Sequence, residues 1–166
     1  MGTLDEQQNR YRLVCPPLNP CWRVAVAIPQ FCLHTLGARQ ALPESLSYSD
    51  AIFNMGRLQF LLEGLKSGDS DLVRLGCQDR WHQNQRAKLV PGLSSVMVRA
   101  QESGAAAAFL SGAGPTVGAF VDHRRGEELG ARVAEQMCLA FEKVGVTAEV
   151  EVMSVDTRGL EVCPIS

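Results

Sequence analysis

The chain has 166 residues, of which 46% are hydrophobic and 20% charged, and its formal net charge is −2. This composition predicts a folded globular protein of one domain, or one domain with a remnant of a second. The near-neutral charge argues against nucleic acid or an anionic membrane as a partner, and no apolar run reaches the ~20 residues of a membrane-spanning helix.

The N-terminus, MGTLDEQQNRYR, lacks the apolar core of a secretory signal. We therefore expect a cytoplasmic protein whose six cysteines are reduced thiols, although an even number also allows disulfides. No two cysteines form a C-x-x-C pair, and no Cys/His cluster has zinc-like spacing. The sequence therefore predicts no metal site built from these residue types.

The first part of the chain predicts one strand and one short helix. Residues 1–23 are polar and then proline-rich, which predicts a connector or a remnant of a preceding domain. Residues 24–28 form an apolar run that ends at Pro29 and predict a buried strand. A short helix over residues 36–42 is expected to stop at Pro43.

A longer helix follows, with Ser47 or Ser49 as its N-cap and Gly68 as its end. Its apolar residues recur at helical spacing and are expected to face inward: Ala51, Met55, Leu58, Leu62 and Leu65. Further helices are expected over residues 69–79 and 93–102.

The last third of the chain predicts strands at 105–110, 117–122 and 146–153, with a helix from 129 to 141 before the last strand. The alanine-rich segment 105–110 favours helix by composition, but it is short and lies between glycines, so we expect a strand. The order strand, helices, strand, strand, helix, strand predicts an α+β protein. Its fold would be a ferredoxin-like β-α-β-β-α-β antiparallel sheet with extra helices in the first crossover and helices on one face.

A glycine loop, SGAGPT, separates the strands at 105–110 and 117–122. Glycines let a backbone approach an anion closely, and successive N–H groups form a nest for phosphate. A tight turn without a ligand is the alternative. The spacing fits neither a Walker loop nor a dinucleotide fingerprint. Because Gly114 precedes Pro115, we expect an extended or positive-φ backbone there, and a Cβ that would enter the space of a bound phosphate.

Two polar segments are candidates for binding an anionic substrate. Residues 79–86 hold two arginines, suited to a carboxylate or phosphate, and His82, which can act as a general base. A solvated helix end is the alternative. Thr35 and Arg39, at positions i and i+4, share one face of the short helix, where a simple surface arginine is the alternative.

Five segments, in this order, resemble homoserine kinases, a family of the GHMP kinase superfamily, over roughly residues 22–160. They are IPQFCLHTLGARQALP (28–43), AIFNMGR (51–57), DRWHQNQRAKLVPG (79–92), LSGAGPT (110–116) and VDTRG (155–159). The resemblance covers only the C-terminal half of such a kinase and implies a GHMP kinase C-terminal domain over residues 24–166. The chain departs from the family at Asn84-Gln85, where Pro-Tyr is usual, and at Leu160, where Ala is usual.

The resemblance also implies a role for each candidate residue. Arg39 and Arg86 would bind the carboxylate of homoserine beside His82, and Thr35 would lie near the transferred phosphoryl group as a catalytic residue. The phosphate end of the site would be shaped by Ser111, Gly112, Ala113 and Gly114. Asn54 and Arg57, opposite the apolar stripe of their helix, are expected to be structural.

The implied activity is ATP-dependent phosphorylation of L-homoserine to O-phospho-L-homoserine, in threonine biosynthesis. ATP and Mg²⁺ would be held mostly by an N-terminal half, whose Pro-x-x-x-Gly-Leu-Gly-Ser-Ser stretch does not occur in these residues. That half is expected in cis or in trans, the chain alone is expected to be inactive, and a homodimer is compatible with the resemblance. The alternatives are an inactive truncated product, a ferredoxin-like regulatory module that binds an amino acid, or a GHMP kinase for another alcohol.

Overall fold

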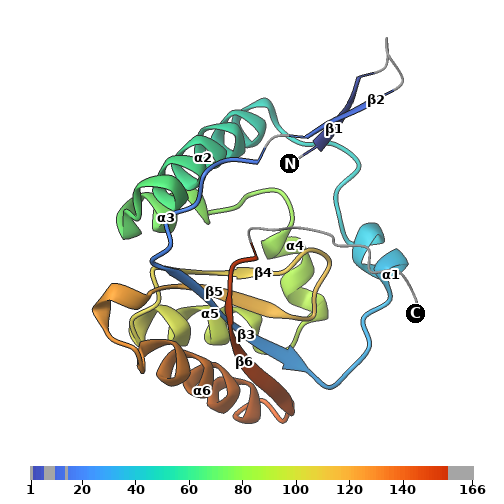
Figure 1. The fold of residues 1–166 in the computed structure, drawn as a ribbon. Helices are drawn as coiled ribbons and strands as arrows, with labels where there is room; N and C mark the ends of the chain where they lie inside the picture. Colours follow the sequence, from blue (N-terminus) through green and yellow to red (C-terminus); the bar gives the residue numbers. More distant parts are fainter. Residues whose placement is uncertain (1, 6–9, 14, 157–166) are drawn as a thin grey trace, which may run out of the picture.

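The computed structural model describes residues 2–5, 10–13 and 15–156. Its centre is a four-stranded antiparallel sheet in the order β4-β5-β3-β6 (Figure 1). The strands are β3 (Trp22–Pro29), β4 (Ala107–Leu110), β5 (Val117–Asp122) and β6 (Ala148–Ser154). Strand β3 pairs with β5 and with β6, as expected of the β-α-β-β-α-β pattern, so the predicted fold is confirmed.

The helices fill the two crossovers of this pattern. Between β3 and β4 lie α1 (Thr35–Gln40), α2 (Tyr48–Ser67), α3 (Ser70–Gly76), α4 (Gln83–Arg86), the 3-10 helix η1 (Ala87–Leu89) and α5 (Leu93–Glu102). Between β5 and β6 lie the 3-10 helix η2 (His123–Arg125) and α6 (Leu129–Glu142). Ser47 caps α2 by accepting from the Asp50 N–H, which decides between the two serines that the sequence allowed. No helix of the described part is long and apolar enough to cross a membrane.

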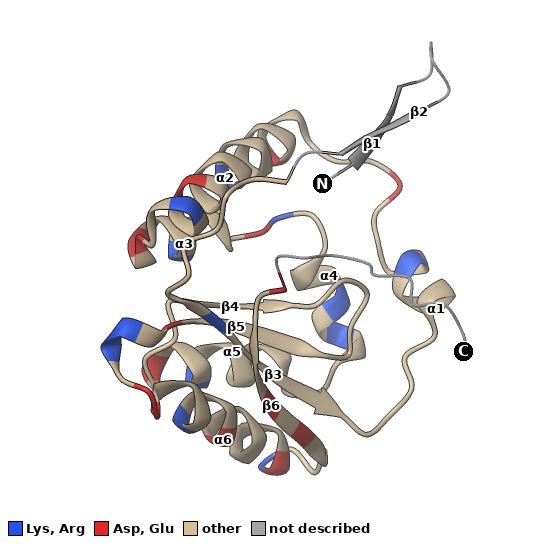
Figure 2. Cartoon of the chain, in the orientation of Figure 1, with Lys and Arg blue, Asp and Glu red and all other residues tan. Residues whose placement is uncertain are grey.

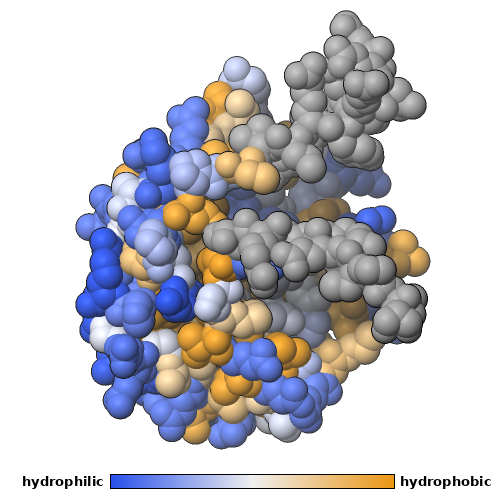
Figure 3. All heavy atoms as spheres, viewed as in Figure 1, coloured by the Kyte–Doolittle hydropathy of each residue, from blue (hydrophilic) through white to orange (hydrophobic). Residues whose placement is uncertain are grey.

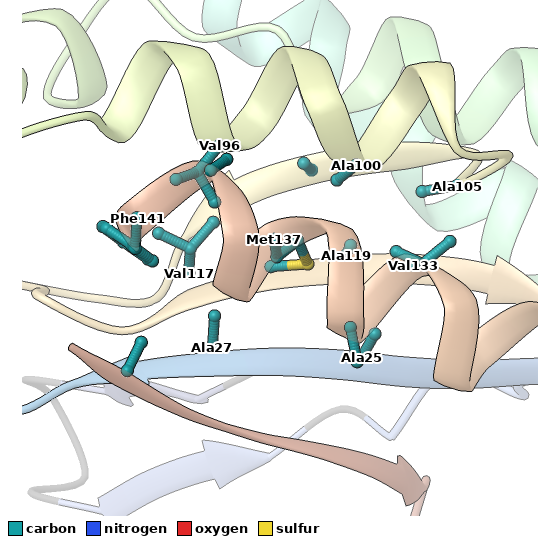
Figure 4. Close-up of a cluster of buried hydrophobic side chains, with 14 of the residues drawn as sticks. Ala25, Ala27, Val96, Ala100, Ala105, Val117, Ala119, Val133, Met137 and Phe141 are labelled. Atoms are coloured by element: carbon teal, nitrogen blue, oxygen red, sulfur yellow. The ribbon is translucent and has the colours of Figure 1, made fainter. Parts of the chain in front are cut away.

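One face of the sheet packs against α5 and α6 and forms the main core (Figure 4). Met137 and Phe141 of α6 are fully buried there. They lie over small residues of the central strands, among them Ala25 and Ala119, which let the helix approach the sheet closely. This face accounts for the periodic apolar residues that predicted α6.

The opposite face is covered in part by α2 and α3, so the expectation of helices on one face only is wrong. Trp22 is buried on this face, its indole Nε1 donates to the Leu65 carbonyl at 3.0 Å, and its ring meets Phe120 edge-on. Val73 of α3 completes the second cluster. Large aromatic side chains on this face need a cover, and the helices of the first crossover supply it.

The apolar stripe predicted for α2 is buried only in its C-terminal half. Leu65 of the stripe packs against the second cluster together with Leu61, which the prediction did not include, whereas Met55 is 65% exposed and Leu58 is exposed as well. Figure 1 shows the reason, because the N-terminal end of α2 projects beyond the sheet. Apolar residues also reach the surface elsewhere on the face seen in Figure 3, and along the edge strand β6 Val152 is 43% exposed.

The N-terminal segment, predicted to be a connector or a remnant of a preceding domain, contains a pair of strands. Strand β1 (Gly2–Asp5) pairs antiparallel with β2 (Arg10–Leu13), and β3 begins at Trp22, inside the range predicted to connect. The last strand begins at Ala148 rather than Val146. Residues 157–166, which include the end of the VDTRG motif and of the predicted domain, lie outside the described residues.

Gly64 and Gly76 allow α2 and α3 to pack as a close pair. We expect Gly76→Ala to destabilise the fold. A Cβ at Gly76 would lie 2.5 Å from the Leu61 Cα, and neither backbone can yield cheaply. Overpacking of this kind costs about 1–3 kcal/mol of unfolding free energy. Urea unfolding would measure it. Gly56→Ala in α2 is the matched control, because its Cβ meets nothing within 4 Å and Ala favours helix. An equal loss in both variants would contradict this account.

Candidate functional site

The polar segment before α5 is a single rigid turn rather than a solvated helix end. Asp79 Oδ2 accepts from the backbone N–H groups of His82 (2.8 Å) and Gln83 (2.7 Å) and so caps α4. Asn54 of α2 donates to the other carboxylate oxygen at 2.7 Å and accepts from the Arg80 N–H at 3.0 Å. Asn54 thereby has a structural contact of the kind predicted for it.

Hydrogen bonds to Asp79 also shift its ionisation. Burial alone would raise the pKa of this carboxyl, but the N–H groups of Gln83 and His82 and the Asn54 amide together hold its pKa below the ordinary value. Asp79 is therefore ionised at neutral pH, as a cap for a helix N-terminus requires.

Arg86 joins three parts of the chain that are far apart in sequence. Its Nε donates to the Ala38 carbonyl in α1 at 3.2 Å, and its Nη1 donates to the Gly112 carbonyl in the glycine loop at 2.8 Å. The same Nη1 lies 3.5 Å from His82 Nδ1. Within the described residues the Nη2 group makes no hydrogen bond, so it is free to bind a ligand.

His82 lies between Arg86 and Asp79, with its Nε2 3.8 Å from Asp79 Oδ1. Burial lowers the pKa of His82, the Asp79 carboxylate opposes this, and the Arg86 charge lowers the pKa further. The net pKa lies below the ordinary value, so His82 is neutral at pH 7. A neutral ring can accept a hydrogen bond or a proton.

The glycine loop is a closed turn in which two adjacent backbone donors are free. Ser111 N–H donates to the Thr116 carbonyl and Gly114 N–H to the Ser111 carbonyl, each at 2.9 Å. The N–H groups of Gly112 and Ala113 donate to no group in the described part of the chain. Both the turn and the anion nest therefore describe this loop, and Gly112 and Ala113 offer two adjacent N–H groups to an anion.

Gly114 has φ +84°, as its position before proline allowed. Its Cβ, however, would lie 3.0 Å from Leu110 Cδ1 and 3.5 Å from Val90 Cγ2, against the protein interior. The expectation that this Cβ would enter the space of a phosphate is therefore wrong. The Gly112 Cβ is the one that would point into open space, because nothing lies within 4 Å of it.

Thr35 and Arg39 both lie on α1 and are exposed. Neither side chain makes a hydrogen bond or ion pair with another described residue, and it is the Ala38 carbonyl between them that links α1 to Arg86. Figure 2 shows basic residues on both α1 and α4. A small cavity of about 280 Å³ lies beside them, between the chain after α1 and the start of α4, and it is lined by Leu42, Pro43, Leu46, Trp81, His82 and Arg86.

The sequence-based reasoning missed one residue at this site. Gln83 is only 8% exposed, and its side chain contacts the strand that leads into the glycine loop. The only signal in the sequence was its place in the His-Gln-x-x-Arg segment. Within residues 2–5, 10–13 and 15–156, no group of three or more His, Cys, Asp or Glu side chains is placed to hold a metal ion.

Curated relatives resemble this chain over most of its length. The homoserine kinase of Desulfitobacterium hafniense is 40% identical over 143 residues, which are 86% of this chain and 47% of that protein. The homoserine kinase of Synechococcus sp. (strain CC9605) is 37% identical over 157 residues, 95% of this chain and 49% of that protein. The chain thus spans about half the length of the curated relatives it matches.

Solved structures share the fold. The crystal structure of homoserine kinase from Cytophaga hutchinsonii superposes with a TM-score of 0.84 at 24% identity, covering 95% of this chain and 49% of that one. Mevalonate kinase from L. major superposes with a TM-score of 0.61 at 12% identity, covering 89% and 47%. At these identities the likeness concerns the fold alone. The sequence family described as GHMP kinases C terminal matches residues 61–138. Residues 61–138 therefore match the C-terminal domain of the GHMP kinases, and the chain has the fold of that domain.

Proposed function

We propose that this chain is the C-terminal half of a homoserine kinase, which transfers a phosphoryl group from ATP to the side-chain hydroxyl of L-homoserine in the cytoplasm, for threonine biosynthesis. The observation that carries the proposal is the position of Arg86. This one guanidinium binds α1, which holds Thr35 and Arg39, and also binds the glycine loop. The identity to homoserine kinases over most of the chain supports the choice of substrate.

The substrate carboxylate would be held by the arginines. Arg86 keeps its Nη2 donors free, and Arg39 makes no competing hydrogen bond within the described residues. Two charge-assisted contacts fix a carboxylate more firmly than neutral donors would. The cavity of about 280 Å³ beside Arg86 has room for a molecule as small as an amino acid.

The glycine loop would face the phosphate end of the reaction. The free N–H groups of Gly112 and Ala113 are suited to phosphoryl oxygens, because preorganised backbone donors stabilise charge without reorganising. Neutral His82 lies beside Arg86, and we propose Thr35 near the transferred group. Phosphoryl transfer depends mainly on positioning and on charge stabilisation, and residues of these kinds provide both.

ATP supplies the phosphoryl group, and Mg²⁺ neutralises its charge. The loop in this chain fits part of a phosphate group but offers no cluster of carboxylates for a metal within the described residues. We propose that most of the ATP and Mg²⁺ contacts come from a segment equivalent to the N-terminal half of the relatives, in the same polypeptide or in a second one. The proposal holds for a monomer or a homodimer.

The test is an assay of ADP release that depends on L-homoserine. The 166-residue chain alone is expected to give no turnover, whereas the chain fused to the N-terminal half of the Desulfitobacterium hafniense homoserine kinase is expected to be active. Mevalonate serves as the control alcohol, because mevalonate kinase shares the fold. Turnover by the folded fusion with mevalonate and not with L-homoserine would refute the proposed substrate, and turnover by the chain alone would refute the need for a second half.

A further inference from the structure

Strand β4 lies at the edge of the sheet and leads directly into the glycine loop. Ser111 N–H donates across to the Thr116 carbonyl, and hydrogen-bonded pairs alternate along an antiparallel ladder. The N–H of Leu110, one residue earlier, therefore points away from β5. Leu110 is buried, so this outward N–H needs a partner within the protein.

Gln83 supplies that partner. Its Oε1 accepts from the Leu110 N–H at 2.8 Å, and its Nε2 donates to the Cys77 carbonyl at the end of α3 at 3.2 Å. The oxygen and the nitrogen of the Gln83 side-chain amide therefore both have hydrogen-bond partners inside the protein. A buried glutamine with both ends bonded is held in one rotamer, so it fixes the strand end relative to α3 and α4.

The same turn of helix also holds the loop itself. Arg86, three residues after Gln83, donates to the Gly112 carbonyl. Gln83 thus anchors Leu110, just before the loop, and Arg86 anchors Gly112, inside the loop. Two anchors on one rigid turn define the direction of the intervening backbone, and with it the direction of the free N–H groups of Gly112 and Ala113.

We propose that Gln83 is a positioning residue for the glycine loop, and that its hydrogen bond to the Leu110 N–H aims the Gly112 and Ala113 N–H groups at an anion. The naming of that anion as a phosphoryl group rests on the proposed function, whereas the placement of the loop by Gln83 does not. A glutamine that only filled the core would affect stability without affecting the loop, so the two roles can be separated.

The experiment is NMR of the amide groups in the 166-residue chain, with inorganic phosphate as the probe. Gln83→Met keeps the size of the side chain and removes both hydrogen bonds. We expect the Leu110 amide to exchange with solvent about fivefold faster or more, since a net hydrogen bond is worth about 1 kcal/mol. The Gly112 and Ala113 amide signals should shift, and their response to phosphate should weaken at least about fivefold. Asn84→Ala, an exposed neighbour, is the control and should leave all of these unchanged.

A variant with a lower melting temperature but wild-type loop signals, exchange and phosphate response would overturn the proposal. If Gln83→Met does not fold, Gln83→Glu decides, because it keeps the acceptor for Leu110 N–H and loses the donor to Cys77. Leu110 protection and loop signals that are retained together or lost together in that variant support the proposal, and a change in one without the other refutes it. A wild-type chain whose loop ignores phosphate would count against the proposed function, while the exchange and shift data still test Gln83.

Discussion

Replacing Arg86 with Ala is expected to remove most homoserine-dependent turnover from a kinase that contains this domain. The substitution deletes a donor to the substrate and also the contacts with the carbonyls of Ala38 and Gly112. Hydrogen bonds to a charged group are worth about 1.5–3 kcal/mol each. Because the glycine loop loses an anchor as well, kcat is expected to fall together with the affinity for homoserine.

Arg39→Ala is the matched comparison. Arg39 is exposed and its side chain makes no hydrogen bond within the described residues, so its loss should raise KM for homoserine with little change in kcat. KM for ATP should change much less in both variants. Steady-state kinetics with each substrate varied in turn separates these effects. Wild-type KM for homoserine in both variants would show that the two arginines do not form the carboxylate site.

The two glycines of the loop are expected to respond in opposite ways to substitution by alanine. Gly114→Ala should lower stability by about 1–3 kcal/mol, because its φ is +84° and its Cβ would press on Leu110. Its N–H is already bound to Ser111, so activity per folded molecule should largely persist. Gly112→Ala should change stability by only about 1 kcal/mol and yet lower kcat strongly, since its Cβ would enter open space beside the free N–H groups.

The check is to measure the thermal midpoint and kcat on the same preparation of each variant. Gly145→Ala is the control for the stability cost of placing a Cβ on a residue with positive φ. Gly145 also has positive φ, at +76°, its Cβ position is open, and it lies far from the glycine loop in the sequence. If Gly112→Ala kept full kcat while Gly114→Ala lost it, the assignment of the two glycines would have to be reversed.

Local patterns were sufficient for most of the fold. Helix α6 and strand β5 lie where apolar periodicity predicted them, because each buries one regular face against the same core. The alanine-rich segment forms β4 despite its helical composition, since burial between two layers outweighs a propensity of a few tenths of a kcal/mol per residue. The helix α2 was predicted correctly, but the burial of its N-terminal half was predicted wrongly, because periodicity marks an apolar face but does not tell whether any neighbour covers it.

The residue types of the candidate site were also within reach of the sequence, since arginines, a histidine and a glycine loop suit an anionic substrate in any fold. Their mutual arrangement was not. The bonds that join Arg86 to Gly112 and Gln83 to Leu110 link residues 26 and 27 positions apart, and no local pattern encodes such a pairing. The sequence by itself determined the order of the strands and the residue types that are available to bind an anion. Only the tertiary structure decided which N–H groups of the glycine loop stay free. The reason is that α4 binds the Leu110 N–H through Gln83 and the Gly112 carbonyl through Arg86, and so fixes the course of the loop backbone.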